Sequence, residues 1–431
     1  MKKISFKFAI SLLMTSLLVS CSDNTSTTLN NLDAQTASIQ SAQTNKKREA
    51  KYNIKLKVKN RLEATDLISH GLDLSGSGNG GNFDAYATQK QIDYAKSKNI
   101  NISNAKNAIA TNAGLPTGYH TVSQVLDMVK GMATKNPSIA SFIDIGDSWE
   151  KTTGKSPNND IWALVLSGKN VNPKTKSTAV FISGMHSREL LPVEINLKLM
   201  DYLISNYGKD PQVTNYIDTR EIVFIPIANI DGRIAVEKGE SMWRKNRHID
   251  SNYDGIDLNR NFDGHWNFEG VNPLTPELKD LQSQLSEKNS EIYSGPNAFS
   301  EPETQTLNNF FKDKNVTVMM DMHAYGNMLL YPPGYDTSAK SDPTTVKVAK
   351  YMAGKNGYKT GTSLEILYAT CGTSKDWGFD KHKAISFTME MGDDSDGFRP
   401  PFTKVEETWA KNKVGLTYLV SIADNPVQRV K

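Results

Sequence analysis

The chain has 431 residues, of which 38% are hydrophobic, so it is long enough for one large globular domain with a smaller one appended. Its 50 basic and 47 acidic side chains leave a formal net charge of +3. This near balance gives no electrostatic basis for binding nucleic acid, and we expect no nucleic acid partner.

The chain starts with the pattern of an export signal. Lys2 and Lys3 precede an apolar run at residues 6–19, and this run is too short to be read as a membrane-spanning helix. We therefore predict a signal peptide at residues 1–20.

A cysteine follows this signal directly. Small residues ahead of Cys21 resemble the lipobox of bacterial lipoproteins, which implies that Cys21 carries a lipid and that the protein is exported and anchored in the bacterial cell envelope. The alternative is an ordinary signal peptide with an incidental cysteine. Residues 21–50, rich in Ser, Thr, Asn and Gln, are predicted to be a flexible tether. If Cys21 is lipidated, Cys371 has no disulfide partner.

Residues 51–105 are predicted to form a small α+β domain. Apolar and polar side chains alternate over residues 52–58, which is typical of a strand with one face in water. Thr88 and Gln91 have the spacing of a capping box, which begins a helix. The other elements expected here are a helix at 62–69 and strands at 85–87 and 99–102.

Four strongly apolar runs in the rest of the chain predict buried parallel strands. After the first run, Pro192 suits a first helical turn, and apolar periodicity continues the helix to about Asn206. Alternation of strands and helices predicts an α/β domain at residues 116–425, with a mixed, largely parallel central sheet flanked by helices. Ligands of such sheets bind outside the carboxyl ends of the strands. The four runs are 179–182, 222–227, 316–322 and 384–389.

Three candidate zinc ligands lie after two of these runs. His186 and Glu189 form an H-x-x-E motif after the first run, and His323 directly follows the third. A catalytic zinc typically takes three protein ligands and leaves its fourth position to water, so this set predicts one zinc site. The motif alone would be weak evidence. Glu390, which follows the fourth run, is expected at the same edge of the sheet.

Two polar segments between these residues are suited to holding a peptide by its end. They lie at residues 243–247 and 255–262. An arginine presents a planar fork that matches a carboxylate, and a neighbouring asparagine adds a donor. Taken alone, such segments are also compatible with a solvated loop carrying surface ion pairs.

The ordered set of motifs resembles the M14 family of zinc carboxypeptidases, of the carboxypeptidase A, B and T type, in a bacterial lipoprotein form. The resemblance covers residues 118 to 423. The segments that carry it are H-S-R-E at 186–189, N-R-N at 259–261, Y-S-G at 293–295, A-F-S-E-P-E-T at 298–304, D-M-H at 321–323 and F-T-M-E at 387–390.

This resemblance implies a role for each site residue. His186, Glu189 and His323 bind zinc. Glu390 is the general base, and Arg244 holds the oxyanion. The substrate-binding residues implied in the same way are Arg188, Asn259, Arg260 and Tyr368, of which Asn259 and Arg260 clamp the terminal carboxylate of the substrate and Tyr368 covers it.

The chemistry of these side chains agrees with the implied roles. A carboxylate beside a zinc site can take a proton from water near neutral pH, which suits Glu390. Negative charge that develops on the former carbonyl oxygen needs a preorganised cation, which suits Arg244. Asp257 is predicted to accept the other ring N–H of His186. The alternative for Asp257 is a loop aspartate that caps a turn.

Lys375 occupies a position that, in the family, lies at the base of the pocket for the substrate side chain. An apolar residue there accompanies hydrophobic preference, and an acidic residue accompanies basic preference. We therefore predict that Lys375 selects a C-terminal Glu or Asp. In the alternative, Lys375 extends to solvent or pairs with an acid such as Asp376.

Together these features predict a zinc metallocarboxypeptidase that hydrolyses the C-terminal bond of peptide substrates, with one zinc per catalytic domain. We expect a monomer that touches the membrane only through its lipid anchor. A zinc peptidase acting on peptidoglycan stem peptides and a non-catalytic peptide-binding module are the alternatives. Residues 51–105 resemble the pro-segments of metallocarboxypeptidases. No cleavage site stands out, which favours a retained module.

Overall fold

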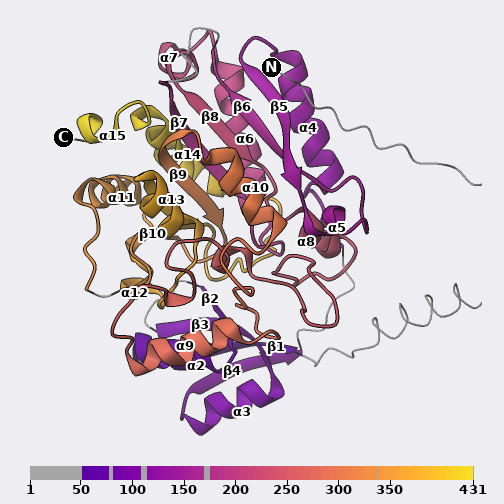
Figure 1. Ribbon diagram of the computed structural model, residues 1–431, viewed down its shortest axis with the longest axis vertical. Coiled ribbons are helices and arrows are strands. Elements are labelled where there is room, and N and C mark those ends of the chain that lie inside the picture. The colour runs from indigo at the N-terminus through magenta and orange to yellow at the C-terminus, as the bar shows by residue number, and fades with distance from the viewer. Residues whose placement is uncertain (1–50, 77–80, 108–113, 169–174, 337, 431) are drawn as a thin grey trace, which may run out of the picture. The chain divides into compact units, whose positions relative to one another are not determined.

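The computed structural model contains two β-sheets within the part of the chain that it describes (Figure 1). No helix of this part is long and apolar enough to cross a membrane. The predicted signal peptide, the tether and Cys21 lie outside it. The described residues are 51–76, 81–107, 114–168, 175–336 and 338–430.

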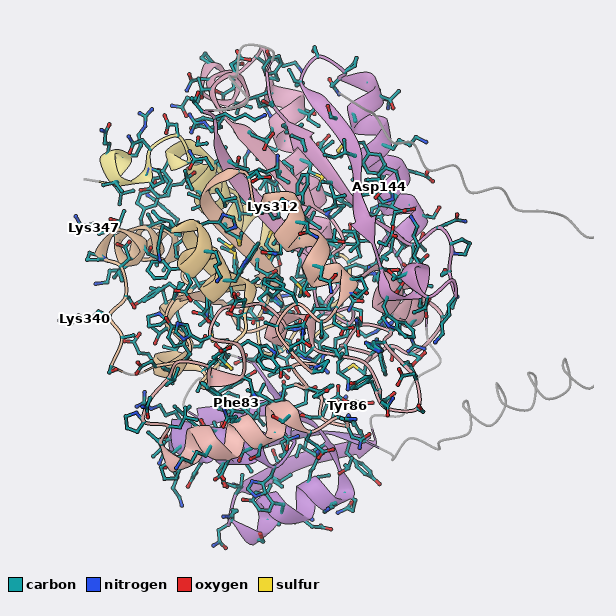
Figure 2. All side chains as sticks on the ribbon, in the orientation of Figure 1. Phe83, Tyr86, Asp144, Lys312, Lys340 and Lys347 are labelled. Atoms are coloured by element: carbon teal, nitrogen blue, oxygen red, sulfur yellow. The ribbon has the colours of Figure 1, made fainter. Side chains whose placement is uncertain are left out.

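The smaller sheet lies in residues 51–107, which we call the N-terminal unit. Its strands are antiparallel, in the order β2-β3-β1-β4. Phe83 is buried and Tyr86 is partly exposed, because alternate residues of β3 face opposite sides (both labelled in Figure 2). The predicted capping box of Thr88 and Gln91 is present. The elements are β1 (Lys51–Lys57), α2 (Arg61–Ser69), β2 (Asp73–Ser75), β3 (Asn82–Thr88), α3 (Gln89–Ser97) and β4 (Asn101–Asn107).

The larger sheet has the order β11-β10-β12-β9-β7-β8-β6-β5 among the described strands. The four strands predicted from the apolar runs are its adjacent centre, β12-β9-β7-β8, and they are parallel. Antiparallel pairs join β10 to β12, β6 to β8 and β5 to β6, so the predicted mixed, largely parallel sheet is confirmed. The strands are β5 (Ala140–Asp147), β6 (Asp160–Leu166), β7 (Ser177–Ser183), β8 (Glu221–Ile225), β9 (Asn315–His323), β10 (Met328–Tyr331), β11 (Lys359–Thr362) and β12 (Ile385–Glu390).

Helices cover both faces of this sheet. On β7, Ala179 and Phe181 join an apolar cluster with the helices α4, α6, α11 and α14, whereas Val180 and Ile182 join another with α10 and α13 (Figure 1). Burial on both faces explains why the central strands are continuously apolar. The helices are α4 (Val122–Lys135), α5 (Trp149–Thr152), α6 (Leu191–Asn206), α7 (Pro211–Thr219), α8 (Ile230–Glu237), η2 (Leu258–Arg260), η3 (Trp266–Phe268), α9 (Pro276–Ser286), α10 (Pro302–Phe311), α11 (Pro343–Asn356), α12 (Ser363–Ile366), α13 (Ser374–His382), α14 (Lys404–Ile422) and α15 (Pro426–Arg429).

The apolar core of the N-terminal unit continues into the rest of the chain. Leu67 of α2 belongs to the same buried cluster as Leu281 of α9 and the free cysteine Cys371. Helix α2 packs against α9, and the two lie side by side in Figure 1. The N-terminal unit and the segments that follow it therefore share one apolar cluster instead of folding around separate cores.

Candidate active site

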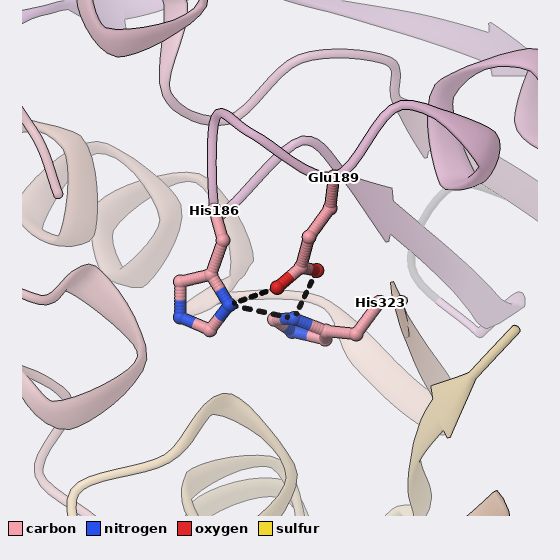
Figure 3. A group of neighbouring side chains, drawn as sticks. All are labelled: His186, Glu189 and His323. Atoms are coloured by element: carbon pink, nitrogen blue, oxygen red, sulfur yellow. Dashed lines mark hydrogen bonds and ion pairs between the residues drawn. The ribbon is translucent and has the colours of Figure 1, made fainter. Parts of the chain in front are cut away.

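Three side chains come together at the carboxyl edge of the larger sheet. His186 Nδ1 lies 2.8 Å from Glu189 Oε1 and 3.0 Å from His323 Nδ1, and His323 Nδ1 lies 3.0 Å from Glu189 Oε2. Figure 3 shows the three side chains pointing toward one another. All three are buried, and they are the group of potential metal ligands found among the described residues. We call them the metal-site residues.

The ends of adjacent parallel strands place these residues together. His323 ends β9 and is in register with Glu390, which ends β12. His186 follows β7 after a turn at Gly184, where φ is 67°. A Cβ at Gly184 would lie 3.2 Å from the Ile227 Cα atom, so the turn needs glycine for both its φ angle and its space.

Two further carboxylates orient the histidine rings. His186 Nε2 lies 3.1 Å from Asp257 Oδ1, and His323 Nε2 lies 2.9 Å from Asp321 Oδ2. With a carboxylate accepting the Nε2–H of each ring, each Nδ1 presents its lone pair to the shared centre. Zinc bonds of about 2.1 Å in a tetrahedral site would place ligand atoms about 3.4 Å apart, within about 0.6 Å of the spacings in this group. The residues present therefore fit a zinc ion.

Asp321 was not given a role from the sequence. The signal for it was available, because residues i and i+2 of a strand point to the same face, and Asp321 is two residues before His323 on β9. The D-M-H motif therefore contains both the candidate ligand His323 and the carboxylate that orients its ring.

Asp257 joins a metal-site histidine to Arg244. Its Oδ2 atom accepts hydrogen bonds from Arg244 Nη2 at 2.8 Å and Nε at 3.2 Å, and its side chain is fully buried. Burial alone would raise the pKa of Asp257, but the Arg244 charge and the hydrogen bond with His186 outweigh burial and hold the pKa well below its ordinary value. Asp257 also caps η2, because its Oδ1 accepts from the Asn259 amide at 3.0 Å.

A cavity of about 50 Å³ brings most of the predicted site residues together. Loss of solvation beside this cavity raises the pKa of the Glu390 carboxyl above its ordinary value, and the Glu189 charge adds to that effect. The lining residues include His186, Arg188, Glu189, Arg244, Asn259, Arg260, Tyr368, Lys375 and Glu390.

The segment proposed to hold the substrate carboxylate is itself held by hydrogen bonds. Asn259 Oδ1 accepts from the Ser374 amide at 2.9 Å. Arg260 Nη1 donates to the Asn259 carbonyl at 2.7 Å. Burial raises the pKa of the Tyr368 hydroxyl, although nearby Arg260 opposes this, so Tyr368 is a neutral donor at physiological pH.

Lys375 lies at this cavity and also pairs with an acid. Its side chain is 1% exposed, and its Nζ donates to Asp376 Oδ2 at 2.8 Å. The contact with Asp376 considered from the sequence is therefore present. It does not remove Lys375 from the cavity, because Nζ has three donors and Asp376 takes one of them.

Arg188 makes a contact that the sequence did not predict. Its guanidinium donates to both carboxylate oxygens of Asp73 in β2, at 2.5 and 3.0 Å, and lies 4.1 Å from the ring centroid of Phe398. Leu74 and Ser75 of the same strand line the cavity. No local pattern could reveal this pair, because more than a hundred residues separate its members along the chain.

Sequence comparison identifies the family of the chain. The family model for zinc carboxypeptidases (Peptidase_M14) matches residues 125–415. The chain belongs to this family. Carboxypeptidase A2 of Rattus norvegicus is 28% identical over 324 residues, which cover 72% of this chain and 71% of that protein. Carboxypeptidase B of Homo sapiens is 29% identical over 305 residues, which cover 67% of each.

Two solved structures share the fold of this chain. The crystal structure of thrombin activatable fibrinolysis inhibitor matches with a TM-score of 0.69 at 22% identity, covering 87% of this chain and 99% of that one. The carboxypeptidase A of Helicoverpa armigera matches with a TM-score of 0.69 at 20% identity, covering 87% and 98%. Residues 116–431 alone make up less than 87% of the chain. The matched region therefore extends into the N-terminal unit, which shares the likeness in fold.

Membership of the family confirms the prediction of a zinc-dependent metallocarboxypeptidase, a peptide hydrolase that uses a catalytic zinc ion and binds peptide substrates. The buried group of His186, Glu189 and His323 offers the donor set that such an ion requires. The family match does not determine which C-terminal residue is removed.

We expect Asp257→Asn to weaken zinc binding about 10- to 100-fold, because an asparagine cannot accept from both His186 and Arg244. A chelator-competition titration of the full chain measures this affinity. Asp250→Asn is the matched control, because Asp250 caps an exposed turn and asparagine keeps its acceptor oxygen. Equal zinc affinity in Asp257→Asn and wild type would show that Asp257 does not support the metal site.

Proposed function

We propose that this zinc carboxypeptidase removes single C-terminal residues from peptides and prefers Glu or Asp at the terminus. The observation that carries the proposal is the shared cavity, where Lys375 lies with Arg260, Glu390 and the metal-site residues His186 and Glu189. A substrate that enters this cavity therefore meets a base, a cation for its terminal carboxylate and a cation for its side chain.

Each of these residues has a step in the proposed mechanism. When bound, zinc acts as a Lewis acid that lowers the pKa of water to about 7. Glu390 takes the proton from the attacking water and later delivers it to the leaving amine. Arg244 donates to the oxyanion of the tetrahedral intermediate. Asp257 keeps the Arg244 guanidinium in place for this role.

Arg260 and Asn259 favour exopeptidase action over internal cleavage. Both side chains are only 5% exposed, so a charge at this position is poorly solvated by water. A terminal carboxylate would pair with Arg260, whereas an internal peptide bond would leave the buried guanidinium without a counterion. In the proposed complex Tyr368 covers the bound terminus.

Lys375 supports the acidic preference despite its contact with Asp376. The pair is nearly neutral, so it does not repel substrates by net charge, but the remaining Nζ donors need acceptors. A glutamate carboxylate supplies them, an apolar side chain supplies none, and a lysine side chain brings a like charge. The family match favours this peptidase activity over the stem-peptide and non-catalytic alternatives.

The proposed location follows from the sequence of the first fifty residues. We propose that residues 1–20 direct export, that Cys21 carries the lipid and that residues 21–50 tether a monomeric enzyme to the cell envelope. Mass spectrometry of the N-terminal peptide from bacterially expressed protein should show a mature chain starting at a lipidated Cys21. An unmodified cysteine, or cleavage elsewhere, would contradict the anchor.

The N-terminal unit is proposed to limit access to the active site. Asp73 neutralises Arg188, a predicted substrate-binding residue, and Leu74 and Ser75 line the cavity beside it. Asp73 is itself buried, so this contact takes up space beside Arg188 that a substrate would otherwise use. Residues 51–105 resemble the pro-segments of metallocarboxypeptidases, and restricting access to the active site is a role that suits such a segment.

Incubation of a peptide library with the full chain tests the activity and its specificity together. We expect zinc-dependent release of single C-terminal residues, abolished by a chelator, with Glu removed faster than Phe and Phe faster than Lys. In Lys375→Asp the order of Glu and Lys should reverse, with a change in the kcat/KM ratio of at least about tenfold. Lys381→Asp, on an exposed part of α13, is the control. An unchanged order in Lys375→Asp would discard the acidic preference.

Asp73→Ala should raise kcat/KM of the full chain several-fold for short peptides. The substitution leaves the buried Arg188 without its counterion, which weakens the seating of the N-terminal unit over the cavity. Asp93→Ala is the control and should leave the rate unchanged, because Asp93 lies on helix α3 and accepts an exposed hydrogen bond from Gln89 Nε2 at 2.8 Å. An unchanged rate for Asp73→Ala in folded protein would show that the N-terminal unit does not restrict access.

A further inference from the structure

Two buried hydroxyl groups at the cavity have no hydrogen-bond partner among the described residues. They are Ser363 Oγ and Thr370 Oγ1, in side chains that are 1% and 6% exposed. Both residues line the same cavity as Lys375. Buried hydroxyls in folded proteins nearly always have a partner, so two that lack one in a single binding cavity point to a polar ligand.

The Thr370 hydroxyl and the Lys375 ammonium lie beside the same point in space. A Cβ atom built on Gly334 would come within 2.4 Å of Thr370 Oγ1, 2.6 Å of Lys375 Nζ and 3.0 Å of Asp376 Oδ2. The absence of a side chain at Gly334 leaves room for these polar groups to converge. The Gly334 amide also donates to Asp376 Oδ1 at 3.0 Å, which holds the counterion of Lys375 in place.

We propose that Ser363 and Thr370 are specificity-determining residues that, together with Lys375, bind the side-chain carboxylate of the substrate's C-terminal residue. This inference rests on the proposed carboxypeptidase function and identifies the groups that recognise the side chain. Substrate binding then gives each orphan hydroxyl an acceptor. Gly334 is a positioning residue, because it leaves the space in which Thr370 and Lys375 approach each other.

The number of donors explains why a carboxylate fits better than other side chains. Lys375 Nζ already donates to Asp376 and lies 3.4 Å from Thr373 Oγ1, and each hydroxyl adds one O–H. An ionised carboxylate accepts on two oxygens and donates nothing, so it can satisfy all the remaining donors. A glutamine side chain offers one acceptor oxygen and an NH₂ group that would face donors, and phenylalanine offers no acceptor.

The test compares kcat/KM for peptides that differ only in a C-terminal Glu, Gln or Phe, using the zinc-loaded full chain. Thr370→Val and Ser363→Ala should each lower the Glu/Phe ratio about tenfold, as expected for one lost hydrogen bond to a charged group. Thr370→Ser should retain the wild-type ratio, and Gly334→Ala should lower it by crowding Thr370 and Lys375. Partial covering of the cavity by the N-terminal unit affects both rates alike and cancels in the ratio.

Ser386→Ala is the matched control. Ser386 Oγ is another buried hydroxyl without a partner among the described residues, but it does not line the cavity, so its removal should leave the ratio unchanged. Calorimetric binding of free glutamate and free phenylalanine to the same proteins provides a readout that does not need turnover. Glutamate should bind Thr370→Val and Ser363→Ala about tenfold more weakly than wild type, with phenylalanine binding unchanged.

The outcomes separate this inference from the proposed function. A wild-type Glu/Phe ratio of kcat/KM and a wild-type glutamate affinity in Thr370→Val and Ser363→Ala would overturn the role of the hydroxyls. This holds for any result with Lys375→Asp. Absence of zinc-dependent release from every peptide would overturn the proposed function, and the glutamate affinities would still decide whether the hydroxyls bind a carboxylate. An equal loss in Ser386→Ala would also count against the inference.

Discussion

The Asp257 carboxylate is the interaction on which the arrangement of the site depends. A fully buried negative charge is tolerated only when positive or hydrogen-bonding groups surround it, and Asp257 is surrounded by His186, Arg244 and the Asn259 amide. His186 belongs to the candidate metal site, Arg244 to the proposed oxyanion position and Asn259 to the proposed carboxylate clamp. One side chain therefore couples the positions of three functional groups that come from different segments of the chain.

The parallel sheet gives this arrangement its rigid base. Because β9 and β12 run in the same direction and in register, His323 and Glu390 end at the same level of the sheet. The loop after β7 then needs only a short turn to bring His186 and Glu189 to His323. Apolar packing on both faces holds these strands, so the geometry of the site does not depend on the loops alone.

The sequence predicted the features that local pattern controls. Apolar runs located the central strands, the Thr88–Gln91 spacing located a helix start, and residues that follow strands predicted the three side chains that cluster as candidate metal ligands. Contacts between distant segments were beyond local pattern: the pairing of Asp73 with Arg188 depends on how two sheets pack, and the unsatisfied state of Ser363 and Thr370 depends on the shape of the cavity. The contact between Lys375 and Asp376 also depends on where α13 begins. Thr373 caps that helix and donates to Asp376, which holds the Asp376 carboxylate beside the lysine.

The apolar cluster shared by α2 and α9 has a consequence for the release of the N-terminal unit. A protease that cut the backbone between the N-terminal unit and the enzyme would break one covalent link and leave the apolar packing between α2 and α9 intact. The two fragments would stay associated until something else separated them. Separation would then expose Leu281 and its apolar neighbours to water. The released enzyme would carry an exposed apolar patch and would tend to associate with other apolar surfaces through it.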